Sequence, residues 1–269
     1  MEKVYVQTYS VCAEPESLPE KLEKLASIGY SGVEFAGYGG LNAKEMKKAL
    51  ADAGLVCVSS HVGMDNIIQD LEYLAELGAK MVVCPGYRFG NRDEALGCAE
   101  RLNKCGEEGA KYGIRVGYHN HISEFWQDGG QYLLDYVIQN TDPENVGFQL
   151  DCGWASAAGI IPQDYINQYP GRLMSVHVKE NNDVVGADNP NPDPNAVPLT
   201  EEERAAENAR RNRLNCPTGQ GIVDWKQVKA AADAQGVTTF IVEREWSYNT
   251  PQNRWECLKA DCEWLKANL

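Results

Sequence analysis

The sequence of 269 residues predicts an α/β protein that folds as a single-domain (β/α)8 TIM barrel. Two observations support this fold class. Eight short apolar runs recur along the chain, and most are separated by segments with helical periodicity. Several of these segments end in a glycine just before the next apolar run, as expected of a helix C-cap. Alternation of strand and helix, repeated to eight strands, is typical of a closed parallel barrel.

The eight predicted strands are rich in β-branched residues and lack strict polar alternation, which is typical of parallel strands covered on both faces. They are residues 4–8, 32–35, 55–61, 81–85, 114–119, 146–151, 173–179 and 238–243. A doubly wound open sheet is the alternative fold. Its dinucleotide-binding turn is not matched by the glycine-rich residues 37–40 after the second run, so the barrel is preferred.

Helical periodicity predicts helices over residues 17–28, 43–53, 67–77, 92–112, 132–138 and 226–234. The regular spacing breaks once, at an insertion of residues 181–221 after the seventh strand. Within it, Thr200 and Glu203 have the spacing of a capping box that begins a charged helix. An insertion here would stand above the carboxyl ends of the strands. We expect it to act as a lid or as a contact between subunits, and a loop without function is the alternative.

Composition excludes several classes of function. The net charge of −14 disfavours binding to nucleic acid or to an anionic membrane surface. Nine cysteines without a CxxC spacing indicate reduced thiols rather than a zinc ribbon. The sequence has no signal-peptide pattern and no apolar stretch long enough to span a bilayer. We therefore expect a cytoplasmic protein with a small-molecule substrate.

The four histidines are all located at the ends of predicted strands. His61 and His119 close the third and fifth strands, His121 follows two residues later, and His177 lies near the end of the seventh. The sixth and eighth strands end in Asp151 and Glu243. In a parallel barrel these ends form one rim, where barrel enzymes place their chemistry.

Three of these rim positions and a glutamate after the fifth strand together predict a metal site. Glu124, Asp151, His177 and Glu243 follow or end the fifth to eighth strands. Three carboxylates and one imidazole suit Mn²⁺, Mg²⁺ or Co²⁺, and a cation would relieve the repulsion among the acids. Each residue alone also has an ordinary interpretation, as an exposed glutamate, a helix-capping aspartate or a buried histidine.

Four motifs, at residues 118–125 (Tyr-His-Asn-His-Ile-Ser-Glu-Phe), 149–154 (Gln-Leu-Asp-Cys-Gly-Trp), 176–180 (Val-His-Val-Lys-Glu) and 241–245 (Ile-Val-Glu-Arg-Glu), resemble those of the xylose isomerase-like barrels. The resemblance is closest to the group called sugar phosphate isomerase/epimerase, and it spans nearly the whole chain.

The resemblance implies one divalent cation, with Mn²⁺ preferred and Mg²⁺ or Co²⁺ as alternatives. Its ligands would be Glu124, Asp151, His177 and Glu243. The ligand after the fifth strand varies within that family, so His119 or His121 could replace Glu124. Glu245 lies on the same side of an extended strand as Glu243 and is a rival for its role.

The implied function is a sugar isomerase or epimerase that removes a proton next to a carbonyl, giving an enediolate that the cation stabilises. Glu124 and Glu243 would act as bases on opposite faces of the substrate, and His121 and Lys179 are further catalytic candidates. The alternative is a lyase or dehydratase on a keto-sugar, an inosose or a 3-keto-glycoside. In that reaction His121 or His119 would protonate the leaving oxygen. A non-catalytic barrel subunit is a third alternative.

The remaining candidates are substrate contacts, namely His61, His119, Trp154, Glu245 and Arg88. Arg88 could receive a phosphate, but no basic cluster or glycine-rich anion site accompanies it. We therefore expect a neutral or carboxylated sugar or keto-sugar rather than a sugar phosphate. We also expect the protein to form a homo-oligomer.

Overall fold

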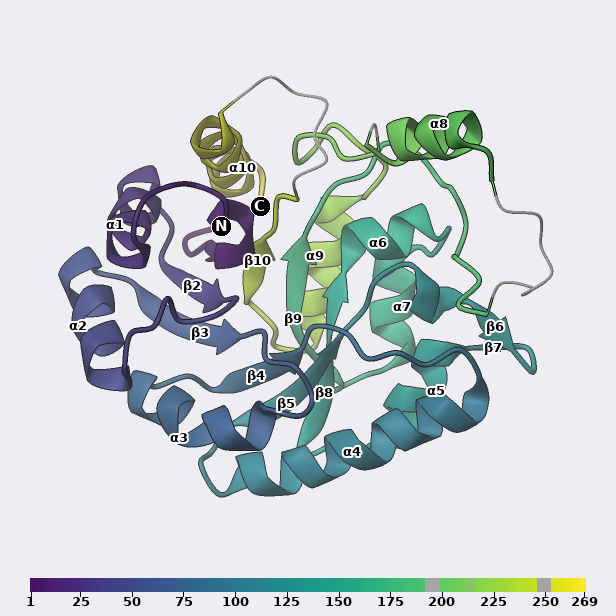
Figure 1. The fold of residues 1–269 in the computed structure, drawn as a ribbon, viewed down its shortest axis with the longest axis horizontal. Helices are drawn as coiled ribbons and strands as arrows, with labels where there is room; N and C mark the ends of the chain where they lie inside the picture. The colour runs from purple at the N-terminus through teal and green to yellow at the C-terminus, as the bar shows by residue number, and fades with distance from the viewer. Residues whose placement is uncertain (192–198, 213, 246–252) are drawn as a thin grey trace.

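The computed structural model describes residues 1–191, 199–212, 214–245 and 253–269. Eight parallel strands form one sheet in the order β3-β2-β1-β10-β9-β8-β5-β4. A single parallel bridge between His61 and Val83 joins the two outer strands, so the sheet nearly closes on itself (Figure 1). The predicted barrel is therefore confirmed.

The barrel strands fall within the predicted ranges, and several are shorter because pairing stops before the apolar run does. They are β1 (Tyr5–Gln7), β2 (Gly32–Phe35), β3 (Val56–Ser60), β4 (Met81–Cys84), β5 (Arg115–His119), β8 (Val146–Asp151), β9 (Leu173–Val178) and β10 (Phe240–Val242). Two further short strands, β6 (Gln127–Asp128) and β7 (Gln131–Tyr132), form a separate antiparallel pair.

Helices surround the barrel and cover the outer face of the sheet (Figure 1). Six match the predicted segments: α1 (Leu18–Ile28), α2 (Ala43–Ala53), α3 (Ile67–Leu77), α4 (Arg92–Ala110), α5 (Leu133–Gln139) and α9 (Trp225–Ala234). The first three end at glycines in the left-handed conformation, as the C-cap pattern predicts. No helix in the described ranges combines the length and apolar character needed to cross a membrane.

Several elements were not among the predicted ones. They are α6 (Cys152–Ala157), α7 (Pro162–Gln168), α10 (Arg254–Asn268) and the 3-10 helices η1 (Thr8–Val11) and η2 (Ser123–Phe125). The helix α6 begins at the residue after β8, so no loop marks its start in the sequence. The helices η1 and η2 lie just beyond the ends of β1 and β5, and η2 alters the position of a predicted site residue.

The insertion at 181–221 is described except for residues 192–198 and 213. Its helix α8 (Glu201–Asn212) begins with the predicted capping box: Thr200 Oγ1 accepts from Glu203 N at 3.2 Å, and the Glu203 carboxylate accepts from Thr200 N at 2.9 Å. Asn191 Nδ2 donates to Gly90 O at 2.8 Å, which ties the insertion to the loop after β4. Its role as a lid or subunit contact stays a prediction.

Glu180, just after β9, anchors the end of the insertion. Its buried carboxylate accepts hydrogen bonds from Gly219 N at 3.0 Å, from Val223 N at 3.1 Å and from Trp225 Nε1. Trp225 begins α9, so one side chain holds the return of the chain to the barrel wall. Charge-assisted hydrogen bonds of this kind are stronger than neutral ones.

A second buried contact holds the carboxyl end of β10, next to the end of the insertion. The guanidinium of Arg244, just after β10, forms an ion pair with Asp261 of α10. Asp261 Oδ1 also accepts from Thr218 N at 3.1 Å, and Arg244 N donates to Ser10 Oγ at 2.9 Å. The carboxyl end of β10 is therefore joined to α10, to η1 and to the end of the insertion.

Replacing Glu180 by alanine should lower the free energy of unfolding by about 3 kcal/mol, because two backbone amides and one indole N–H lose their buried acceptor. Urea denaturation measures this change. Glu72→Ala, at an exposed position of α3, is the matched control and should change stability by less than about 0.5 kcal/mol. Equal stability of the two variants would contradict the anchoring role of Glu180.

Candidate metal centre

Strand register brings polar side chains together at the carboxyl ends of the strands. Asp151 of β8 lies opposite His177 of β9, and His119 of β5 lies opposite Gln149 of β8. His177 also lies opposite Ile241 of β10. Because side chains alternate along a strand, Glu243 projects to the same face as Ile241, two residues farther toward the rim.

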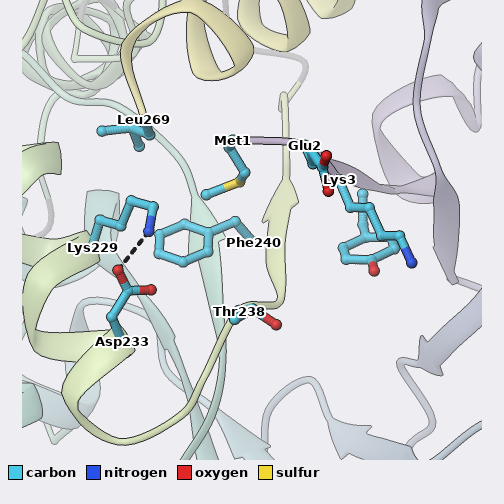
Figure 2. A pocket seen from close by; sticks show the side chains of 9 residues that line it. Met1, Glu2, Lys3, Lys229, Asp233, Thr238, Phe240 and Leu269 are labelled. Carbon is cyan, nitrogen blue, oxygen red and sulfur yellow. Dashed lines mark hydrogen bonds and ion pairs between the residues drawn. The ribbon is translucent and has the colours of Figure 1, made fainter.

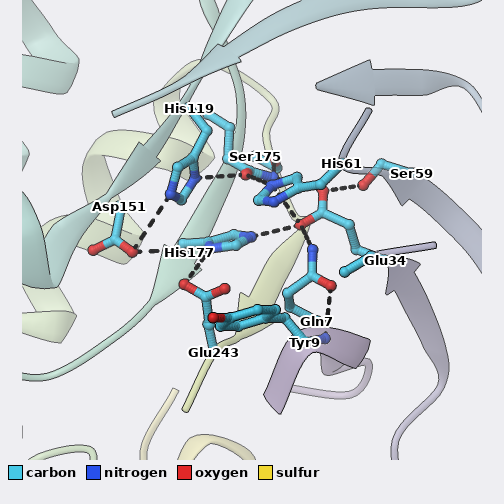
Figure 3. A network of polar contacts seen from close by, with 12 residues as sticks. Gln7, Tyr9, Glu34, Ser59, His61, His119, Asp151, Ser175, His177 and Glu243 are labelled. Carbon is cyan, nitrogen blue, oxygen red and sulfur yellow. Dashed lines mark hydrogen bonds and ion pairs between the residues drawn. The ribbon is translucent and has the colours of Figure 1, made fainter. Parts of the chain in front are cut away.

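Four buried side chains form a cluster at this rim: His119, Asp151, His177 and Glu243. One potential ligand atom from each lies within 4.8 Å of the others. The His177 Nδ1 atom is 3.5 Å from Glu243 Oε2 and 3.9 Å from Asp151 Oδ2, and His119 Nε2 is 4.0 Å from Asp151 Oδ2 (Figure 3). Ligand atoms at roughly 2.0–2.2 Å from one cation have separations of this order.

Two atoms of the cluster show that it suits a cation. Within the described ranges, His177 Nδ1 and Asp151 Oδ2 are buried without a hydrogen-bond partner. Buried polar atoms are normally satisfied, so such a pair indicates an ion or ordered water. Imidazole nitrogen and carboxylate oxygen are ligands for Mn²⁺, Co²⁺ and Zn²⁺. The residues present therefore fit a divalent cation.

Asp151 has two separate functions through its two oxygens. Oδ1 caps α6 by accepting from Trp154 N at 2.8 Å, while Oδ2 faces the cluster. Asn120 fixes its backbone, because Asn120 Oδ1 accepts from Asp151 N at 2.9 Å. Gly153 allows α6 to start here: a Cβ at that position would lie 2.8 Å from the carbonyl oxygen of Lys179. The cap therefore fixes the direction of the oxygen that faces the cluster.

Burial and mutual charge shift the pKa values of the cluster strongly. Burial, reinforced by Glu243, raises the pKa of Asp151 to about 7, although Lys179 opposes the shift. Burial alone would favour neutral His177, but Glu34 and Glu243 raise its pKa to about 10. Burial also disfavours ionised Glu243, yet its close contact with protonated His177 lowers its pKa to about 2. An imidazole must lose its extra proton before it can ligate a metal ion. A bound cation would therefore replace the positive charge that protonated His177 supplies to the cluster.

The predicted ligand Glu124 is not brought into this cluster. Its carboxylate accepts from Tyr118 OH at 2.9 Å, from His121 N at 3.0 Å and from Ser123 Oγ at 3.1 Å. The 3-10 turn η2 directs the side chain back toward its own loop. His119, which the sequence analysis kept as an alternative ligand, lies in the cluster instead.

Four of the other predicted residues form one side of the site. Lys179 Nζ forms an ion pair with Glu245 and lies 4.0 Å from the centroid of the Trp154 ring. Glu245 therefore contacts Lys179, and the carboxylate in the cluster is that of Glu243. The His121 ring is 5.0 Å from the His119 ring and 6.1 Å from the Trp154 ring. Burial lowers the pKa of His121, which favours a neutral imidazole beside the cluster.

The last two predicted substrate contacts lie in different surroundings. The His61 ring stacks on His177 at 5.2 Å, and its Nε2 lies 2.8 Å from Gln149 Oε1, below the cluster. Arg88 is exposed in the loop after β4 and is not brought into the cluster.

The floor of the site, which is the polar interior of the barrel, was not predicted from the sequence. Glu34 of β2 is fully buried and accepts from His177 Nε2 at 2.6 Å, from Gln7 Nε2 at 2.8 Å and from Gln149 Nε2 at 2.9 Å (Figure 3). Ser59 Oγ donates to the same carboxylate. A lone acid inside the apolar run 32–35 was the available signal.

A pocket of about 330 Å³ lies elsewhere (Figure 2). It is bounded by Met1 and Leu269, near the two ends of the chain, and by the Lys229–Asp233 ion pair. Its other lining residues include Thr238, just before β10. This is the amino end of the barrel, opposite to the cluster, so the pocket does not contribute to the candidate metal centre.

Comparison with known proteins supports the fold. The inosose dehydratase of Geobacillus thermodenitrificans is 24% identical over 254 residues, which cover 83% of this chain and 80% of that protein. Other inosose dehydratases match over shorter parts of their length.

Solved structures share the whole barrel. A sugar phosphate isomerase/epimerase from Parabacteroides distasonis is 25% identical with a TM-score of 0.75, covering 99% of this chain and 94% of that one. A protein named IOLI, solved with a zinc atom, is 14% identical with a TM-score of 0.70 and covers 98% of this chain and 97% of that one.

The family model for xylose isomerase-like TIM barrels matches residues 22–268. This match covers nearly the whole chain and confirms the resemblance seen in the four motifs. The chain belongs to the xylose isomerase-like TIM barrel family.

Proposed function

We propose that the protein is a divalent-cation-dependent lyase that eliminates water from a sugar-like or cyclic polyol ketone. The observation that carries the proposal is the buried cluster of His119, Asp151, His177 and Glu243 at the barrel rim. A divalent cation bound there would act as a Lewis acid on the substrate carbonyl. Such activation makes the proton on the neighbouring carbon easier to remove.

The position of Glu124 favours elimination over epimerisation. Epimerisation needs one base on each face of the substrate, and Glu124 was the expected partner of Glu243. Its carboxylate instead accepts hydrogen bonds from Tyr118 of β5 and from His121 and Ser123 of its own loop. Elimination needs only one proton-transferring group, provided that it can also protonate the leaving oxygen.

His121 is the group best placed for this transfer. It lies beside the cluster near Trp154, and burial lowers its pKa, so the neutral ring can accept a proton. In the proposed reaction His121 takes the proton from the carbon next to the carbonyl. The electrons of that C–H bond form the new C=C bond, and the C–O bond of the neighbouring hydroxyl breaks. The imidazolium returns the proton to the departing oxygen, which leaves as water, and the organic product is an enone.

Lys179 and Trp154 would orient the substrate. The ammonium of Lys179 is held by Glu245 and by the face of the Trp154 ring. It can therefore donate to a substrate oxygen without first being ordered, and the indole offers an apolar wall for a sugar ring. The name inosose dehydratase, borne by relatives that align with most of this chain, supports a polyol ketone as the substrate class.

An isomerase or epimerase of sugars is the second candidate. The solved structure from Parabacteroides distasonis with that name has 25% identity and covers 99% of this chain. Both reactions begin with the same proton removal, and they differ in whether a hydroxyl group leaves. Mn²⁺ is the cation that we propose, with Mg²⁺, Co²⁺ or Zn²⁺ as outcomes that elemental analysis distinguishes.

The metal site predicts about one divalent ion per chain in protein purified without added metal, measured by elemental analysis. His177→Ala, Glu243→Ala and His119→Ala should lose the ion, because each removes a member of the cluster. Glu124→Gln is the control and should keep it, because Glu124 bonds to its own loop. Loss in the Glu124 variant with retention in the His119 variant would instead restore the ligand set expected from sequence.

The reaction class is tested by incubating the metal-loaded protein in D₂O with an inosose, a 3-keto-glucoside and a ketohexose. We expect loss of water from the inosose or release of the aglycone alcohol from the 3-keto-glucoside, detected as an enone or its tautomer by mass spectrometry and NMR. Deuterium uptake with recovery of an isomer of unchanged composition would identify an isomerase or epimerase. Absence of exchange and of elimination with every substrate would favour a non-catalytic barrel.

Substitution of His121 by asparagine should lower kcat about 10²–10⁴-fold, the usual contribution of a general acid–base group. Metal content should stay at the wild-type value, because the cluster does not include His121. Steady-state kinetics and elemental analysis on the same preparation measure both quantities. A variant with normal kcat would remove His121 from the proton-transfer role and leave the metal site intact.

A further inference from the structure

The buried carboxylate of Glu34 connects two histidines of the candidate metal centre. It lies on the β2 side of the barrel interior and is fully buried. One oxygen accepts from His177 Nε2 and Gln7 Nε2, and the other accepts from Gln149 Nε2 and Ser59 Oγ. A carboxylate surrounded by four donors can only be an acceptor, so the orientation of each partner is determined.

We infer that Glu34 is a positioning residue that sets the tautomers of His177 and His119, so that the ligand nitrogens of both face the cation site. This inference rests on the proposed metal site and adds a residue that does not ligate. Figure 3 shows the His177 ring between Glu34 on one side and Asp151 and Glu243 on the other.

The effect on His177 is direct. Its Nε2 lies 2.6 Å from Glu34 Oε1, so this nitrogen carries the proton and donates it. In the neutral ring the other nitrogen, Nδ1, then holds the lone pair. Nδ1 is the atom that faces Asp151 and Glu243. A carboxylate that holds the far side of a ligating imidazole in this way also increases the basicity of the ligand.

The effect on His119 passes through Gln149. The Gln149 amide nitrogen must face Glu34, at 2.9 Å, because a carboxylate cannot donate. The Gln149 carbonyl oxygen therefore points the other way, to His119 Nδ1 at 2.9 Å. His119 must donate from Nδ1, which leaves the lone pair on Nε2, the nitrogen directed at Asp151. His61 Nε2 lies 2.8 Å from the same Gln149 oxygen and 3.1 Å from Glu34 Oε1, so this nitrogen faces two acceptors and must donate.

A glutamine at position 34 cannot accept from both His177 Nε2 and the Gln149 amide nitrogen. If its amide nitrogen faces Gln149, that amide must turn over, and His119 Nδ1 then meets a donor and loses its proton to Nε2. If its amide nitrogen faces His177 instead, His177 Nε2 must accept, and the proton moves to Nδ1. Either orientation places a proton on one nitrogen that should ligate, because the opposite ring nitrogen no longer finds an acceptor.

The test uses full-length protein labelled with ¹⁵N-histidine and loaded with Zn²⁺, which is diamagnetic. The chain has four histidines, so its imidazole spectrum is simple, and His61→Asn and His121→Asn assign two of them by their absence. In the wild type we expect Nδ1 of His177 and Nε2 of His119 to bind the ion. In Glu34→Gln one of the two should show the opposite protonation, and the Zn²⁺ affinity measured by calorimetry should fall about 10–100-fold.

Two further variants separate positioning from general loss of structure. Ser59→Ala removes a donor to the same carboxylate without inverting any amide, so both tautomers and the Zn²⁺ affinity should stay as in the wild type. Gln149→Met interrupts only the arm to His119, so His119 should populate both tautomers while His177 is unchanged. This variant also tests the inference if Glu34→Gln does not fold.

Three results would overturn the inference. The first is unchanged ligand nitrogens and Zn²⁺ affinity within about 3-fold of wild type in Glu34→Gln. The second is an equal loss of affinity in Ser59→Ala. The third is unchanged His119 protonation in Gln149→Met. A wild-type protein in which Zn²⁺ leaves the His119 and His177 signals unmoved would instead show that the proposed metal site is wrong, and the positioning role with it.

Discussion

Compensation of buried charge is the constraint on which this end of the barrel depends. Asp151, His177, Glu34 and Glu243 are all buried within the same few ångströms. An ionised group in such surroundings is costly unless opposite charge or hydrogen bonds accompany it. Glu34 has its donors, whereas Asp151 Oδ2 and His177 Nδ1 have no hydrogen-bond partner among the described residues. The hydrogen bonds of Glu34 are therefore satisfied, whereas the cluster above it has ligand atoms available for a cation.

The fold satisfies this constraint through strand register and through anchors just outside the barrel. Register aligns Asp151 with His177, and the start of α6 at the end of β8 directs one oxygen of Asp151 to the helix and the other to the cluster. Glu180 and the Arg244–Asp261 pair then fix the segments that leave β9 and β10. Glu180 follows β9, which carries His177, and Arg244 follows Glu243. Loss of either anchor would therefore disturb both the stability of these loops and the positions of the cluster residues.

Patterns that depend on local sequence were predicted well. Strand positions, most helices, the C-cap glycines and the capping box of α8 all follow from periodicity and from backbone preferences of a few neighbouring residues. The convergence of Asp151, His177 and Glu243 also followed, because parallel strands end at the same rim. The helix α6 was missed because its six residues follow β8 directly and are too few to show a period.

The remaining differences between the predicted and the observed site concern side-chain direction. Whether Glu124 faces the rim depends on the turn η2, which reverses the chain after β5 and brings three donors to the carboxylate. No spacing rule for strands describes that turn. Glu34 is the opposite case, since its strand was predicted correctly but its partners come from β3, β8, β9 and the start of the chain. Only the closed barrel brings these together.

A ligand set with His119 in place of Glu124 would change what the site can bind. Three carboxylates and one imidazole would leave a divalent cation with one excess negative charge, and such an oxygen-rich set suits Mg²⁺ as well as Mn²⁺. Two carboxylates and two imidazoles balance the charge of the ion, and they favour Mn²⁺, Co²⁺ or Zn²⁺ over Mg²⁺. A neutral ligand in place of an acid also leaves more positive charge on the ion, which strengthens its pull on a substrate carbonyl. In the reaction that we propose, the turn that keeps Glu124 out of the cluster would therefore both remove a second base and strengthen the electrophile, and both effects would favour elimination.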